Sequence, residues 1–155
     1  MMSRVKMGLV AGFAATLAVS VLEAVNMAVG HWAVSFPQLL AVMVGMPDVP
    51  AVGWIAHVVT GTLILGPAFG LLCPRLPSDT PESKGILFAV GAFILMGLTV
   101  APVAGVGPFF MRAGFGTLAW MIATHAIFGI VLGNVYGRLV QRARRHPPVG
   151  AATAH

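Results

Sequence analysis

This sequence is dominated by four long apolar stretches, at about residues 7–30, 51–73, 85–106 and 115–137. A helix rises about 1.5 Å per residue, so each stretch is long enough to cross roughly 30 Å of hydrocarbon. Polar segments that contain proline or glycine separate the stretches and are typical of connecting loops. The sequence therefore predicts an all-α fold, an integral membrane four-helix bundle that forms a single domain over residues 1–155.

The composition excludes an ordinary soluble domain. Only 8% of the 155 residues are charged and 58% are hydrophobic, whereas soluble domains carry roughly a quarter charged residues. So few charges cannot cover the surface of a water-soluble fold of this size. Cys73 is the only cysteine, which also excludes a disulfide scaffold.

The basic residues are concentrated on one side of the four-span topology. Only Arg112 falls on the other side, and the eight on the side of the termini are Arg4, Lys6, Arg75, Lys84, Arg138, Arg142, Arg144 and Arg145. By the positive-inside rule, both termini are expected in the cytoplasm. Residues 138–155 are expected to form a basic cytoplasmic tail, in which Arg138, Arg142, Arg144 and Arg145 anchor the topology and contact lipid headgroups. Nucleic acid is not an expected partner, because the basic residues are not interleaved with aromatic ones.

The second and fourth apolar stretches resemble each other. His57-x-x-x-Gly61 in one corresponds to His125-x-x-x-Gly129 in the other, and residues 65–72 then align with residues 132–139 after a slip of a single residue. This internal repeat predicts that the bundle is a duplicated helix hairpin. Two copies of a two-span unit are expected to be related by an axis along the membrane normal.

The loop after the first span contains an apolar segment at residues 37–46. We expect a short helix there. Between a lid over the bundle and an anchor at the outer interface, the sequence favours the anchor.

Glycines recur every four positions along the predicted spans. This spacing puts them on one helix face, where close backbone approach drives association in lipid. We expect these glycines, and Gly61 of the His-x-x-x-Gly motif with them, to pack helices within the chain rather than against another chain. The glycines spaced by four are Gly8, Gly12, Gly66, Gly70, Gly129, Gly133 and Gly137.

Four polar residues inside the spans are the candidate functional residues, namely Glu23, Asn26, His57 and His125. Counted at 1.5 Å per residue from the outer edge, Glu23 lies at a depth of about 10 Å, His57 at about 9 Å and His125 at about 14 Å. A lone buried carboxylate is costly in lipid, so Glu23 is expected to face the bundle and to meet His57, His125 or Asn26.

Three roles are open for this polar cluster. The leading one is a hydrogen-bonded latch that sets the helix register. The second is cofactor binding, with haem b held between His57 and His125. A metal site of two histidines and Glu23 would take single ligands scattered over three helices, so no metal is predicted. The third is passage of protons or small solutes, although no comparable polar residue continues the path through the inner half of the membrane.

No motif of the common enzyme classes is present in the sequence, which lacks a P-loop, GxSxG, HExxH and CxxC. We therefore expect a non-catalytic protein, an accessory or structural subunit of a larger membrane complex such as a respiratory or photosynthetic assembly. Its expected partners are membrane lipids and other membrane-protein subunits. The alternatives are an electron-transfer or quinone-associated protein that uses His57 and His125, and an oligomeric small-solute or proton-coupled transporter.

Two segments carry a resemblance to a known family. One is residues 6–16, Lys-Met-Gly-Leu-Val-Ala-Gly-Phe-Ala-Ala-Thr, and the other is residues 50–57, Pro-Ala-Val-Gly-Trp-Ile-Ala-His. Together with the Gly-rich fourth span, they resemble a family of small uncharacterised bacterial four-helix inner-membrane proteins. The resemblance covers nearly the whole chain. It implies a four-pass fold in the bacterial inner membrane and transfers no catalytic residue.

Overall fold

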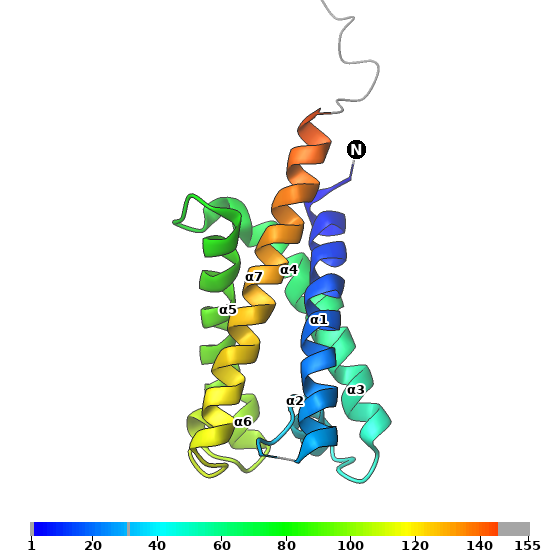
Figure 1. The fold of residues 1–155 in the computed structure, drawn as a ribbon, viewed down its shortest axis with the longest axis vertical. Helices are drawn as coiled ribbons and strands as arrows, with labels where there is room; N and C mark the ends of the chain where they lie inside the picture. The colour runs from blue at the N-terminus through cyan, green and yellow to red at the C-terminus, as the bar shows by residue number, and fades with distance from the viewer. Residues whose placement is uncertain (1, 31, 146–155) are drawn as a thin grey trace, which may run out of the picture.

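The computed structural model describes residues 2–30 and 32–145. Four helical segments in it are long and apolar enough to cross a membrane: Arg4–Val29 (α1), Pro50–Arg75, Pro81–Val103 and Phe115–Arg145 (α7). Helix α1 begins and α7 ends at the same end of the molecule, at the top of Figure 1, which we call the terminal end. The opposite end is called the distal end.

The second span is interrupted by a π-helical turn. It consists of four consecutive pieces: α3 (Pro50–Val59), the π-helix η1 (Thr60–Leu65), α4 (Gly66–Leu72) and the 3-10 turn η2 (Cys73–Arg75). Pro67 follows this turn and has no N–H to donate to the backbone hydrogen bonds of a regular α-helix. A π-helical turn accommodates one residue more than an α-helical turn. The π-helix covers most of the five-residue step from Gly61 to Gly66, which the alignment predicted from the sequence pairs with the four-residue step from Gly129 to Gly133.

The third span starts earlier than its apolar stretch and is broken near its distal end. Helix α5 (Pro81–Leu98) begins behind Thr80, whose hydroxyl accepts from the Ser83 N–H at 3.2 Å. A hydroxyl cap followed by proline is a local helix start signal. After a break at Thr99, the short helix α6 (Val100–Val103) and the 3-10 turn η3 (Pro108–Phe110) lead to α7.

Helix α7 extends beyond the end predicted for the fourth span. It continues from Gly137 to Arg145 as one unbroken helix, so the first part of the expected tail is helical. The reason is local, because the segment is rich in leucine, glutamine, alanine and arginine, which are good helix formers. The rest of that tail, residues 146–155, lies outside the described residues.

The loop helix α2 (Phe36–Met43) packs into the bundle. Leu39 and Leu40 are each only 2% exposed, and an added Cβ on Gly53 of α3 would collide with the Pro37 carbonyl. The expectation that this segment lies on the membrane surface was therefore wrong. Its apolar residues cover the distal end of the helices as a lid, because that position buries more of their surface.

Glycines allow close contact within two pairs of helices. On α1, Gly8 and Gly12 meet the backbone of Gly66, and on α5 Gly85 meets the backbone of Gly129 and Gly133. At each of these positions a Cβ would collide with main-chain atoms, which cannot rotate away. The other predicted glycines also face the chain itself, since Gly70 meets the Arg4 carbonyl, Gly61 meets the Thr16 side chain and Gly137 meets the Pro81 ring.

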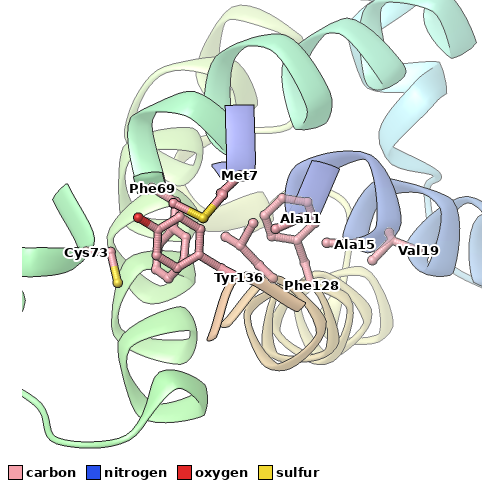
Figure 2. Close-up of a cluster of buried hydrophobic side chains, with 9 residues drawn as sticks. Met7, Ala11, Ala15, Val19, Phe69, Cys73, Phe128 and Tyr136 are labelled. Atoms are coloured by element: carbon pink, nitrogen blue, oxygen red, sulfur yellow. The ribbon is translucent and has the colours of Figure 1, made fainter. Parts of the chain in front are cut away.

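The interior between these pairs is filled by one apolar cluster, shown in Figure 2. Its members come from α1, the second span and α7, and they are Met7, Ala11, Ala15, Val19, Phe69, Cys73, Phe128, Leu132 and Tyr136. Phe69 packs edge-on against Tyr136 with ring centroids 5.2 Å apart. A second apolar cluster, around Phe110 and Met121, lies under the lid at the distal end.

Candidate functional site

Three of the four predicted polar residues line one small cavity inside the bundle. Glu23 comes from α1, His57 from α3 and His125 from α7, and the cavity has a volume of about 40 Å³. Thr60 and Thr124 add hydroxyl groups to its wall. The structure thus brings together one carboxyl group and two imidazole rings from three different helices.

Glu23 is fully buried and is held by Trp120. Its side chain is 0% exposed, and the Trp120 indole N–H donates to Oε1 at 3.0 Å. The expectation that a histidine or Asn26 would be its hydrogen-bond partner was therefore wrong. Within the part of the chain that the structure describes, Oε2 has no hydrogen-bond partner.

The two histidines are engaged differently. His57 Nε2 lies 3.2 Å from Ser20 Oγ, while Nδ1 has no hydrogen bond to any described residue. His125 Nδ1 lies 2.7 Å from the Met121 carbonyl oxygen. Because a carbonyl only accepts, Nδ1 of His125 must carry the proton.

Aromatic rings hold both imidazoles in place. Phe36 and Trp54 pack edge-on against His57, with centroids 5.7 and 5.9 Å away. Phe93 packs edge-on against His125 at 5.5 Å. These contacts limit the rotation of both rings.

Asn26 is buried but does not line the cavity. Its Nδ2 donates to the Ala33 carbonyl at 2.9 Å, across the turn that follows α1. This bond ties the loop before α2 to the end of α1. The structure therefore separates Asn26 from the other three predicted polar residues.

Sequence reasoning missed two residues of the site, Trp120 and Ser20. Ser20 precedes Glu23 by three residues, a spacing that places both on one helix face. A buried tryptophan N–H needs an acceptor, and Glu23 is the only acidic residue within the apolar stretches. Both signals are present in the sequence, but neither one identifies the partner.

The cavity is too small for a haem. Pockets for small organic ligands measure roughly 300–1,000 Å³, whereas this one measures about 40 Å³, and each imidazole already has a polar contact. Among residues 2–30 and 32–145, no three histidine, cysteine or acidic side chains are placed to hold a metal ion. The volume is large enough for water, since a single water molecule needs at least about 10–15 Å³.

The apolar cluster, whose side chains are drawn in Figure 2, separates this cavity from the terminal end. Val19 and Phe128 of that cluster border the cavity. Cys73 and Tyr136 lie at the opposite end of the cluster, toward the terminal end of the molecule. No polar path through this stretch is provided by the described side chains. The four arginines predicted to contact headgroups lie beyond it, exposed on the last turns of α7: Arg138, Arg142, Arg144 and Arg145.

Comparison with known proteins relates the chain to one family. The sequence profile of a family of unknown function (DUF6789) matches residues 2–146. No curated protein and no solved structure gives a significant match.

Proposed function

The chain belongs to the DUF6789 family of unknown function, and we propose that it is a non-catalytic integral membrane protein that acts by binding another membrane protein. In this proposal it is an accessory or structural subunit of a larger membrane complex, of the respiratory or photosynthetic type. The polar cavity is then a latch that fixes the positions of α1, α3 and α7 relative to one another.

The observation that carries the proposal is the exposed apolar surface at the distal end. Large apolar side chains there are strongly exposed, with Val29 at 74%, Met111 at 79% and Phe115 at 83%. They lie at or beyond the ends of the spanning helices, where acyl chains give way to headgroups and water. Exposed apolar groups in such a position favour contact with another protein.

The filled interior supports the same conclusion. Phe69 and Leu132 are 0% exposed, and the cluster around them occupies the centre of the bundle. A single bundle packed in this way offers little room for solute passage, and its polar cavity does not accommodate a haem. Both alternatives are therefore less well supported than a role that depends on the protein surface.

We also propose where the protein lies in the cell and that its fold arose by duplication. We place the protein in the bacterial inner membrane, surrounded by lipid, with both termini in the cytoplasm, because the basic residues gather at the terminal end.

We also infer that the four spans form a duplicated helix hairpin. The π-helix at Thr60–Leu65 supports it, because it takes up the single-residue slip between the two similar spans.

Gentle extraction from native membranes tests the function. We expect the tagged full chain to copurify with a second membrane protein at a fixed stoichiometry. The double variant Met111→Ala/Phe115→Ala should lose this partner, because the change removes the exposed apolar groups.

The matched control is Leu63→Ala/Ile64→Ala, which truncates two apolar residues that are 58% and 57% exposed in the middle of a span, where they would face lipid. It should keep the partner. The proposal fails if the wild-type chain migrates alone at every protein concentration, or if both double variants lose the partner equally.

A further inference from the structure

A second and much larger cavity opens at the terminal end. It is a cleft of about 750 Å³ between the start of α1, the turn η2, the start of α5 and the last turns of α7. Its volume falls within the range of sites that bind small molecules. The proposed function makes no use of this cleft.

Basic side chains from three separate elements line the cleft. They are Arg4 from α1, Lys84 from α5 and Arg144 from α7, and among the described residues Asp79 is the only acidic one in the wall. The Lys84 ammonium donates to the Cys73 carbonyl at 3.2 Å, which holds this charge against the wall. The cleft therefore carries a net positive charge that the fold assembles from distant parts of the sequence.

The inner part of the cleft is apolar. Met7 and Tyr136 form it and are 6% and 5% exposed, and Val140 lies between them and the exposed Arg144. Along α7, Tyr136 and Arg144 are about 12 Å apart. A bound molecule would thus meet apolar groups at one end and positive charges at the other.

The start of the helices adds to the positive potential. Ser3 and Pro81 border the cleft and stand at the N-termini of α1 and α5. The partial positive charge of a helix N-terminus favours an anion nearby. It acts in the same direction as the three basic side chains.

From this arrangement we infer that the cleft is a binding site for a phosphate ester, with Arg4, Lys84 and Arg144 around the phosphate. Two sources share this chemistry, namely the headgroup of an acidic phospholipid and a soluble phosphate ester. The apolar floor favours the phospholipid, whose glycerol backbone and first methylenes would contact Met7 and Val140. Of the four arginines on the last turns of α7, only Arg144 lines the site.

Binding to the purified full chain in a neutral detergent tests this inference. The probes are a short-chain phosphatidylglycerol, phosphatidylcholine of the same chain length, and glycerol 3-phosphate. We expect phosphatidylglycerol to bind most tightly. Equal binding of glycerol 3-phosphate would identify a soluble ester as the source, and binding of none of the three would overturn the inference.

Paired variants show whether the cleft itself is responsible. A basic group near an anionic surface contributes roughly fivefold in affinity, so Arg4→Ala/Arg144→Ala should weaken phosphatidylglycerol binding by about 30-fold. The control Arg138→Ala/Arg142→Ala removes the same charge from exposed positions outside the cleft. It should change binding by less than about twofold.

A third variant blocks the space without removing charge. Ala143 lines the cleft and is half-buried, so Ala143→Trp should abolish binding while all three basic groups remain. Circular dichroism should show unchanged helix content and melting temperature in each variant. The inference is overturned if the two double variants weaken binding equally, or if a folded Ala143→Trp protein binds as tightly as the wild type.

Discussion

Replacement of Trp120 by phenylalanine tests whether the buried polar cavity is a structural latch. The substitution removes the N–H that donates to Glu23 at 3.0 Å and keeps an aromatic ring next to Trp32. Glu23 is 0% exposed, so its carboxyl group cannot turn to water. Losing the partner of a buried polar group costs about 1–3 kcal/mol of stability in soluble proteins. A side-chain hydrogen bond between membrane helices contributes about 0.6 kcal/mol on average and at most about 1.7 kcal/mol. We expect Trp120→Phe to lower the free energy of unfolding by about 1–2 kcal/mol.

A double-mutant cycle isolates the hydrogen bond from the loss of ring size. Glu23→Leu removes the acceptor, so Trp120→Phe should cost about 1 kcal/mol less in that background than in the wild type. The free energy is measured by reversible unfolding in mixed micelles, followed by far-ultraviolet circular dichroism. Trp54→Phe is the matched control, because Trp54 packs on His57 beside the same cavity, and its coupling with Glu23→Leu should stay below about 0.3 kcal/mol. A coupling below about 0.3 kcal/mol between positions 23 and 120 would refute the latch.

Three further predictions follow from the packing. Gly85→Ala should lower the free energy of unfolding by about 1–3 kcal/mol, because the added Cβ meets the Gly129 carbonyl. Gly91→Ala is the control and should not destabilise the protein, because the space around Gly91 is open. Equal losses of stability in unfolding titrations would contradict this packing. Leu132→Ala should lower the free energy of unfolding by about 2–5 kcal/mol, because it leaves a void in the apolar cluster. Leu95 is 65% exposed, so Leu95→Ala should lower this free energy by less than about 0.5 kcal/mol. The visible spectrum of protein purified from cells with ample haem should show no Soret band, and stoichiometric haem would contradict the cavity volume.

Much of the fold was predictable because its signals are local. The predicted start of the second span lies one residue from Pro50, and the Thr80-Pro81 start signal marks the beginning of α5. Hydropathy failed at the end of α7, because a helix continues past the membrane wherever the residues favour it and no breaker intervenes. The lid α2 was misplaced, because hydropathy is the same for a helix on lipid and a helix packed on protein.

The candidate site was predictable in part. The helical rise places Glu23, His57 and His125 at similar depths, and the structure places all three around one cavity. The partner of Glu23 was not predictable, because Trp120 is 97 positions away. Which residue of α7 meets Glu23 depends on how that helix is rotated about its axis.

The amino-acid sequence alone determined that this chain forms four apolar helices, where most of them begin, and which few polar groups must be buried. Those properties depend on hydrophobicity and on neighbours within a few residues. Tertiary structure decided that Trp120 holds Glu23, that α2 closes the distal end, and that Arg4, Lys84 and Arg144 line one cleft. The physical reason is that close glycine contacts fix the rotation and separation of the helices, and these contacts exist only when distant segments meet.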